Sequence, residues 1–213
     1  MIERKNARLL AFAAFIIFVS TIGVLLARQL NVGPVRPSPA FRTIGPEKAP
    51  VQIFEYTDFA CPACRAAAGK IEEMHKVFGD GLRVSFKHYP LLNIHPWSLH
   101  AAAYADCAGA QGKFREYAAL LFENQAKWGQ AKSKPAEFKA FAEQLKLDWP
   151  AMEACSQAPE TLKVLKLDIA EADMKGVNAT PTFFINGKRA VGSGQLIDQA
   201  MKFDNLLRSA GKP

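Results

Sequence analysis

The first 27 residues combine a basic start with a long apolar run. Arg4, Lys5 and Arg8 are followed by residues 9–27, which contain no charged side chain. A helix of that length spans about 28 Å, close to the hydrocarbon thickness of a bilayer. The positive-inside rule then places residues 1–8 in the cytoplasm and the rest of the chain outside. The pattern predicts an uncleaved membrane anchor, and a cleaved signal peptide is the alternative.

A short linker and a folded domain are predicted after this segment. Residues 28–41 include Pro34, Pro37 and Pro39, a composition typical of a stiff, polar linker. Residues 42–213 then carry apolar positions at strand or helix spacing almost throughout, and they are numerous enough to bury a core of their own. We therefore expect a single domain there.

The order of elements within this domain indicates its fold. An apolar run over residues 51–56 predicts a buried strand, residues 61–78 carry apolar positions at helical spacing, and residues 82–86 alternate as a second strand. Residues 97–176 are helical in pattern throughout. A strand over residues 182–185, an Asn-Gly hairpin turn, a return strand and a last helix complete the chain. This order predicts an α/β thioredoxin-like fold with a helical insertion at about 97–176.

Composition and charge exclude several classes of protein. The hydrophobic fraction is 49% and the charged fraction 22%, which excludes a disordered or collagen-like chain. The formal net charge is +7, but beyond residue 39 there are 22 basic and 19 acidic residues without a basic block. We therefore expect no nucleic-acid binding.

The chemistry of the chain is concentrated in a Cys-Pro-Ala-Cys motif between the first predicted strand and its helix. Pro62 suits the first helical position. Cys61 would then lie at the positive end of the helix dipole, beside free backbone N–H groups, and both effects lower the pKa of its thiol. Cys64, one turn further along, should be more buried and suited to resolving a mixed disulfide. Half of a zinc site and a purely structural disulfide are the less favoured alternatives.

Two motifs together resemble the DsbA-like thiol-disulfide oxidoreductases of bacteria. The first is the Cys-Pro-Ala-Cys motif at 61–64, and the second is Thr-Pro-Thr-Phe-Phe-Ile-Asn-Gly at 180–187. The resemblance covers roughly residues 42–210. It implies that Pro181 is a cis-proline facing the active cysteines and that the backbone of Thr180 pairs with substrate. It also implies a quinone-linked membrane oxidase that resets the pair, and no bound cofactor.

Glu55 is a further candidate, because it lies in an otherwise apolar strand six residues before Cys61. In the resembled family an acid at this place lies under the disulfide and assists proton transfer. A buried carboxyl has a raised pKa, which suits it to accept the proton of the resolving thiol. Lys87 is either its partner or a surface lysine, and a solvent-facing Glu55 is the alternative to a buried one.

Two residues depart from the best-known pattern of this family. Ala63 replaces the histidine often found between the cysteines, and Thr180 stands where the strongest oxidants often have valine. Both point to a milder oxidant. The direction of electron flow is therefore less well determined than the type of chemistry.

Cys107 and Cys155 lie in the predicted insertion. As a disulfide they would close a loop of about 48 residues, which would stabilise the fold by about 4 kcal/mol; two buried free thiols are the alternative. His95 and His100 are five residues apart, a poor fit to one helical face, so we expect no metal site.

These observations predict a thiol-disulfide oxidoreductase that exchanges its Cys61–Cys64 disulfide with cysteines of exported proteins as a disulfide-forming oxidase. It would be tethered by one helix to a bacterial inner membrane, with the domain on the periplasmic side. A disulfide reductase or isomerase is the alternative within the same chemistry. A non-catalytic metal chaperone, binding metal through the two thiolates, is the alternative from another class.

Overall fold

The computed structural model describes residues 12–23 and 35–210, with side chains placed as far as residue 203. Residues 12–23 form a helix in a unit of the chain that ends at residue 35. Within the described residues, no helix combines the length and the hydropathy that crossing a bilayer requires. The predicted anchor over residues 9–27 extends at both ends outside the described residues.

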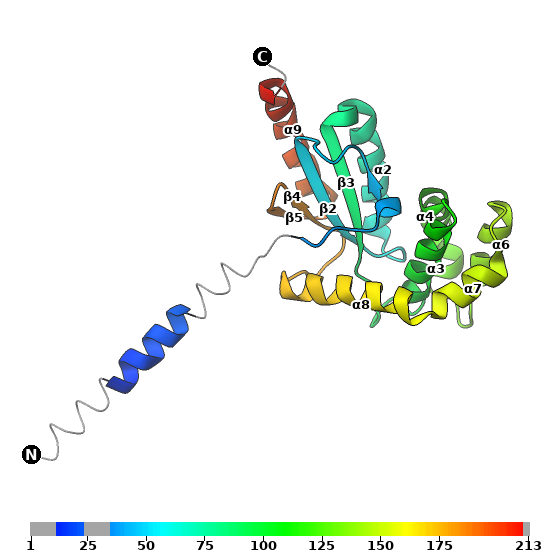
Figure 1. Ribbon diagram of the computed structural model, residues 1–213, viewed down its shortest axis with the longest axis horizontal. Coiled ribbons are helices and arrows are strands. Elements are labelled where there is room, and N and C mark those ends of the chain that lie inside the picture. Colours follow the sequence, from blue (N-terminus) through cyan, green and yellow to red (C-terminus); the bar gives the residue numbers. More distant parts are fainter. Residues whose placement is uncertain (1–11, 24–34, 211–213) are drawn as a thin grey trace, which may run out of the picture. The chain divides into compact units, whose positions relative to one another are not determined.

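A five-stranded sheet with the order β1-β3-β2-β4-β5 forms the centre of the domain (Figure 1). The strands are β1 (Thr43–Ile44), β2 (Val51–Thr57), β3 (Leu82–His88), β4 (Thr182–Ile185) and β5 (Lys188–Val191). Strand β2 is parallel to β3 and antiparallel to β4, so it is hydrogen-bonded on both sides. Its last residue therefore lies at the middle of the sheet, and the segment that follows is held there.

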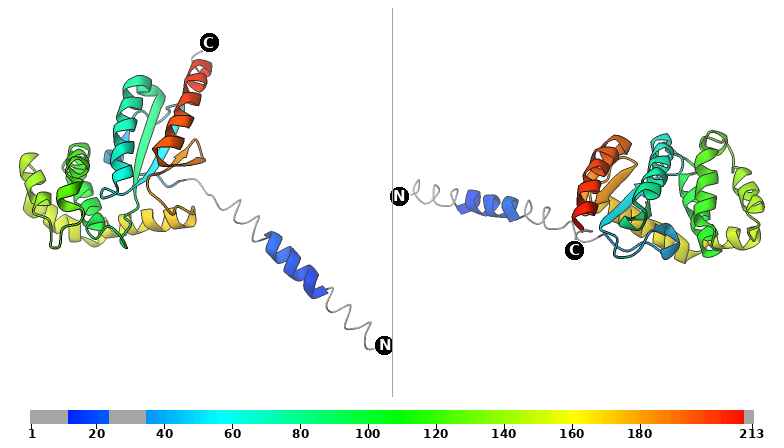
Figure 2. Two further views of the ribbon diagram at one scale, coloured as in Figure 1. Left: turned by 180° about the vertical axis from the view of Figure 1, so that it is seen from behind. Right: turned by 90° about the horizontal axis from the view of Figure 1, so that it is seen from above.

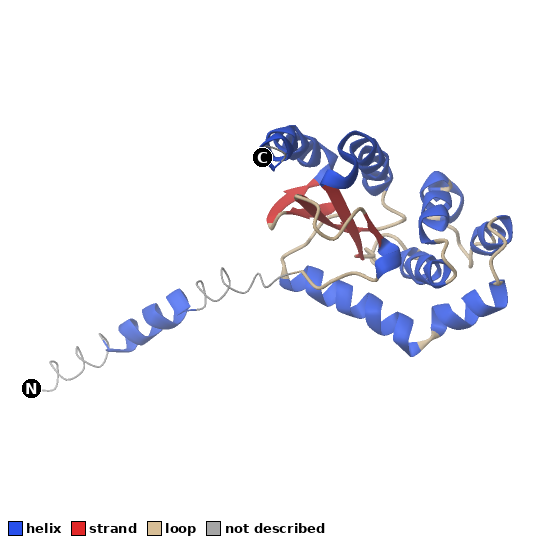
Figure 3. Cartoon of the chain, turned by 45° about the horizontal axis from the view of Figure 1, so that its top comes forward, coloured by secondary structure: helices blue, strands red, loops and turns tan. Residues whose placement is uncertain are grey.

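Helices cover both faces of this sheet. Helix α2 (Pro62–Phe78) and helix α9 (Gly192–Ala210) pack against each other on one face, and α8 (Pro159–Met174) lies on the other (Figure 3). Alternate residues of β2 point to opposite faces, which is the ordinary consequence of the pleat. The apolar core under α2 and α9 is formed by these alternate residues and their neighbours, among them Val51, Ile53, Ile71, Val84, Phe183, Leu196 and Phe203.

The remaining helices form a block beside the sheet (Figure 2). They are α3 (Ser98–Ala110), α4 (Phe114–Glu123), α5 (Gln125–Trp128), α6 (Glu137–Gln144) and α7 (Trp149–Gln157). Buried aromatic side chains fill the block, with Trp128 and Phe138 at ring centroids 5.4 Å apart. The thioredoxin-like fold with a helical insertion is thus confirmed, and α8 both ends the insertion and covers the sheet.

The edge of the sheet differs from the sequence-based expectation. The pattern of residues 43–44 does not predict β1, which pairs with β3 through Thr43 and Ile44. Residues 36–42, assigned to the linker up to residue 41, lie against the domain because two arginines are bound by buried acids. Arg36 Nη2 is 2.7 Å from Asp168 Oδ1, and Arg42 Nη1 is 2.5 Å from Asp168 Oδ2.

Candidate redox site

Cys61 and Cys64 lie where β2 ends and α2 begins. Cys61 is the residue before the helix, Pro62 is its first residue, and the Cys61 N–H donates to the Asp58 carbonyl at 3.0 Å to close the turn. Both cysteines are free thiols. Cys61 keeps 9% of its surface exposed and Cys64 keeps none, so an incoming sulfur can reach only Cys61.

The helix start stabilises the thiolate of Cys61. A hydrogen bond from the Cys64 thiol is the main cause, and the Thr180 side chain and the backbone N–H groups of Cys64 and Ala63 add to it; against the opposing effect of burial, they lower the pKa of Cys61 to about 5. The thiolate is the nucleophile in disulfide exchange and also the better leaving group. Cys61 is therefore ionised at neutral pH, as the motif predicts.

Cys64 has the opposite tendency. Burial raises the pKa of its thiol, and the hydrogen bond with Cys61 and the nearby carboxylate of Glu55 raise it further. The backbone N–H of Asp58 donates to Cys64 Sγ at 3.4 Å and fixes the sulfur behind Cys61. One thiol of the pair is thus prepared to attack or leave, and the other stays protonated until its proton is removed.

The second predicted motif lies across from these cysteines. The Thr180–Pro181 peptide bond is cis, and Cys61 Sγ lies 3.5 Å from the Thr180 carbonyl oxygen, within hydrogen-bond reach when the thiol is protonated. The segment follows α8 and leads into β4, so residues about 120 positions apart in the sequence meet at one site. The turn at Asn186 and Gly187 that follows β4 is also present, with both residues at positive φ.

Glu55 is buried beneath the pair on the face of the sheet that α2 covers. Its side chain is 1% exposed, and neither carboxylate oxygen has a hydrogen-bond partner among the described residues. Burial raises the pKa of Glu55 to about 8. A carboxyl in this state is protonated at neutral pH and can exchange a proton with a thiol of raised pKa.

The structure contradicts both expectations for Lys87. It pairs with Tyr56 across the parallel strands, one residue beyond the pair formed by Glu55 and Phe86, and it therefore points to the opposite face. There it is fully buried, with its Nζ 2.9 Å from Glu171 Oε2 and 3.3 Å from Asp168 Oδ1. Lys87 is neither a partner of Glu55 nor a surface lysine.

Asp58 and Gln125, two buried polar residues beside the pair, were not among the predicted site residues. Asp58 Oδ1 accepts from the Ala60 N–H at 2.8 Å, and Gln125 Nε2 donates to the carbonyl oxygens of Phe59 at 2.6 Å and Cys61 at 2.9 Å. Asp58 carries a weak sequence signal, because an acid between a buried strand and a helix start is a common turn residue. Gln125 carries none.

Cys107 and Cys155 form a disulfide, which links α3 to α7. Among the described residues, no cluster of three or more histidine, cysteine or acidic side chains has an arrangement that would hold a metal ion. Two histidines are instead buried against acids: His88 Nε2 lies 2.9 Å from Asp106 Oδ1, and His95 Nδ1 lies 2.8 Å from Asp58 Oδ2.

The comparisons with solved structures agree with this geometry. The chain is similar to DsbA2 of Pseudomonas aeruginosa, at 25% identity and a TM-score of 0.64 over 76% of this chain and 94% of the other. It is also similar to alpha-DsbA1 of Wolbachia pipientis, at 23% identity and a TM-score of 0.70 over 86% and 97%. It is similar as well to BdbD of Bacillus subtilis, at 19% identity and a TM-score of 0.68 over 82% of this chain and 98% of the other.

The chain also matches part of each of several curated sequence relatives. The chain is 37% identical over 150 residues to the Na(+)/H(+) antiporter NhaA 1 of Salinispora arenicola, a match that covers 70% of this chain. The chain spans only 22% of that relative's length. Over its own residues 38–206, the chain matches the family model described as thioredoxin. The chain therefore belongs to the thioredoxin family, in the DsbA-like form that the two motifs predicted, with the paired thiols of a thiol-disulfide oxidoreductase.

Proposed function

We propose that this chain is a disulfide-forming oxidase that exchanges its Cys61–Cys64 disulfide with cysteines of exported proteins. The observation that carries the proposal is the pKa of Cys61, which is lowered to about 5 beside a fully buried second thiol. A stabilised thiolate favours the reduced form of the pair, and a pair that favours its reduced form readily oxidises other thiols.

The first step breaks the disulfide of the oxidised chain. A substrate thiolate attacks Cys61 Sγ, a mixed disulfide forms, and Cys64 leaves as a thiolate. Because the pKa of Cys64 is raised well above its ordinary value, this thiolate takes up a proton. Glu55, whose pKa is about 8, is the buried acid that supplies it.

The second step releases the product. A second thiolate of the substrate attacks the substrate sulfur of the mixed disulfide, and Cys61 leaves as a stable thiolate. Two substrate thiols have then become a disulfide, and their two electrons remain in the reduced Cys61–Cys64 pair. The Thr180 carbonyl lies beside this site, and the backbone of Thr180 would pair with that of the substrate. A quinone-linked membrane oxidase would take the electrons and restore the disulfide.

The N-terminal segment bears on where in the cell this chemistry takes place. We infer that residues 9–27 anchor the chain in a bacterial inner membrane and that the domain lies on the periplasmic side. The support is the uncharged run with Arg4, Lys5 and Arg8 before it. An oxidising compartment of this kind is also where structural disulfides such as Cys107–Cys155 persist.

Equilibration with glutathione tests the direction of the reaction. We expect a reduction potential well above that of thioredoxin, which is about −270 mV. A value near that figure would rule out a dedicated oxidase and favour the reductase or isomerase alternative. In parallel, Cys61→Ser should abolish disulfide transfer to a reduced peptide, and retained transfer would overturn the assignment. A Cys107→Ser, Cys155→Ser double variant is the control, because it keeps both redox thiols.

The metal-chaperone alternative has its own test. Copper titration of the reduced chain should give no stoichiometric binding at Cys61 and Cys64 if the pair serves only in exchange. Tight binding that Cys61→Ser abolishes would favour the chaperone, since thiolates are soft ligands that suit Cu(I).

A further inference from the structure

The turn of residues 58–61 connects the end of β2 to the start of α2, so its position sets the position of the Cys61 sulfur. The backbone within the turn contributes one bond, from the Cys61 N–H to the Asp58 carbonyl. The carboxylate of Asp58 adds a second bond inside the turn, from the Ala60 N–H. Further polar contacts reach the turn on two sides from groups that precede or belong to the helical insertion.

On one side, α5 brings the amide of Gln125 to the turn. Its Nε2 donates to the carbonyl oxygens of Phe59 and Cys61, and the side chain is 7% exposed. The Cys61 carbonyl also accepts the first backbone bonds of α2, from the N–H groups of Cys64 at 3.0 Å and Arg65 at 3.2 Å. Gln125 thus binds the same carbonyl oxygen that accepts the first backbone hydrogen bonds of α2.

On the other side, the carboxylate of Asp58 is bound by the segment between β3 and α3. Oδ2 accepts from the Leu91 N–H at 2.8 Å and lies 2.8 Å from His95 Nδ1, while the Ser98 hydroxyl donates to Oδ1. Asp58 is 2% exposed. Because the Asp58 N–H donates to Cys64 Sγ, this cluster is connected to the second sulfur directly.

We propose that the helical insertion sets the redox equilibrium of the Cys61–Cys64 pair by holding this turn, with Gln125 as the positioning residue on one side and Ser98, through Asp58, on the other. The inference rests on the proposed thiol-disulfide exchange and adds a role for a part of the chain that does not touch substrate. A fixed turn keeps the N–H groups of Ala63 and Cys64 directed at Cys61 Sγ. Without Gln125, the Cys61 carbonyl also loses one of the three donors that bind it.

Gln125→Leu tests the proposal, because leucine keeps much of the volume and removes both donors. We expect the pKa of Cys61, followed by thiolate absorbance in the reduced chain, to rise by about one unit, the order of magnitude of one or two lost hydrogen bonds. The equilibrium constant with glutathione should fall about tenfold, or about 30 mV toward the reducing side.

Gln130→Leu is the matched control. Gln130 lies five residues away, and its Nε2 donates at 3.0 Å to the carbonyl of Ile94, outside the turn. This variant should leave the Cys61 pKa and the glutathione equilibrium unchanged. A Gln125→Leu protein that loses thermal stability but keeps both wild-type values would show that Gln125 only supports the fold, and the proposal would fail.

Ser98→Ala provides a second, milder variant from the opposite side of the turn. It removes one hydroxyl donor to Asp58 and should raise the Cys61 pKa by a smaller amount, about half a unit. If Gln125→Leu does not fold, an unchanged Cys61 pKa in Ser98→Ala overturns the proposal. Both readouts use glutathione and thiolate absorbance alone. A wild-type chain that fails to oxidise a peptide would therefore count against the oxidase function and leave this test intact.

Discussion

The two faces of the central sheet hold buried charge in different ways. On the face under α2, Glu55 is buried without a hydrogen-bond partner among the described residues, and burial raises its pKa to about 8. On the face under α8, Asp168 is fully buried but binds Arg36, Arg42 and Lys87. Although burial alone would raise the pKa of Asp168, Arg42 first and then His88 and Lys87 keep it below its ordinary value.

The difference separates two uses of a carboxyl group. A carboxylate paired with several cations stays ionised across the physiological range, and it holds segments of the chain together. A carboxyl without a partner avoids the cost of a buried charge by keeping its proton, and it can exchange that proton near neutral pH. Strand β2 thus lies between the ion cluster under α8 on one face and Glu55, a proton donor beside Cys64, on the other.

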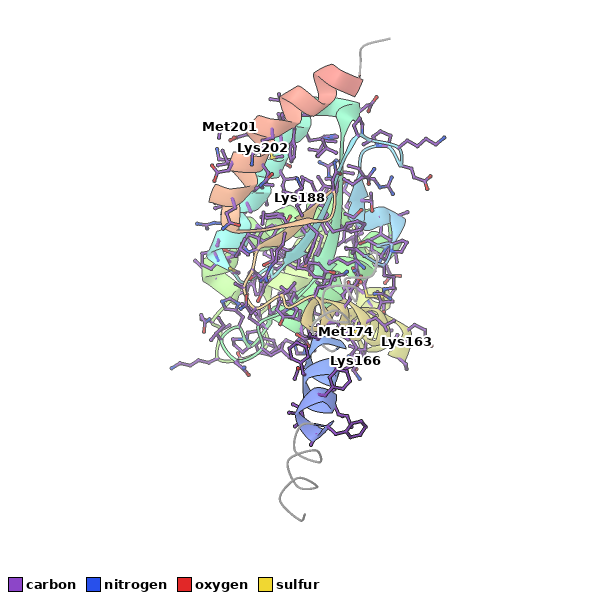
Figure 4. The ribbon with its side chains drawn as sticks, turned by 90° about the vertical axis from the view of Figure 1, so that its left-hand side faces the viewer. Lys163, Lys166, Met174, Lys188, Met201 and Lys202 are labelled. Carbon is purple, nitrogen blue, oxygen red and sulfur yellow. A yellow bond between two sulfur atoms is a disulfide. The ribbon has the colours of Figure 1, made fainter. Side chains whose placement is uncertain are left out.

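Replacing Arg42 should lower the unfolding free energy most, because it disrupts the ion cluster under α8. Its guanidinium is fully buried and binds both Asp106 and Asp168. Arg42→Met leaves both acids without their main partner and should lower the unfolding free energy by about 3–5 kcal/mol, measured by denaturant titration. Lys166→Met on the exposed side of α8 (Figure 4) is the control and should change it by less than about 0.5 kcal/mol. Equal losses would show that the buried cluster is not special.

Replacing Glu55 should change how the unfolding free energy depends on pH, which distinguishes this face of the sheet from the other. The folded pKa of about 8 exceeds the ordinary value of 4.5, so the stabilising contribution is full below about pH 4.5 and is lost as the pH rises through 8. In the oxidised chain, where the redox cysteines do not titrate, wild type should lose a few kcal/mol between about pH 5 and pH 9 that Glu55→Gln does not lose. Glu72→Gln, at an exposed position of α2, should follow wild type. If the unfolding free energy of Glu55→Gln fell with pH as that of wild type does, the raised pKa of Glu55 would be contradicted.

Arg36 should give the smallest effect. Its Nη2 binds the same Asp168, but its side chain is 39% exposed, and solvent screens such a pair. Arg36→Ala should lower the unfolding free energy by less than about 1 kcal/mol in the same titration. A loss as large as that of Arg42→Met would mean that residues 36–42 depend on both arginines equally.

The sequence pattern predicts the elements whose neighbours are near in the chain. The strand over residues 182–185 and the turn at Asn186 and Gly187 are found where expected, since local turn chemistry determines them. The helix that begins after Cys61 is likewise local, because Pro62 and the apolar spacing are sufficient to indicate it. The backbone N–H groups of Ala63 and Cys64, which help to lower the pKa of Cys61, belong to the same motif.

The sequence pattern fails where a residue is defined by distant partners. Strand β3 extends to His88 rather than ending at residue 86, because Lys87 finds its acids 81 and 84 positions further along. Gln125 binds carbonyl groups 66 and 64 positions before it. No periodicity records such contacts, since they depend on how the helical block packs against the sheet.

The disulfide between Cys107 and Cys155 has a consequence for how the chain matures. The four cysteines form two pairs of sequence neighbours: Cys61 and Cys64 are the redox pair, and Cys107 and Cys155 are bonded to each other. Because a chain is synthesised from its N-terminus, the first two thiols are available to an oxidant before the third exists. Pairing in the order of synthesis gives the bond between Cys107 and Cys155 without any shuffling of disulfides.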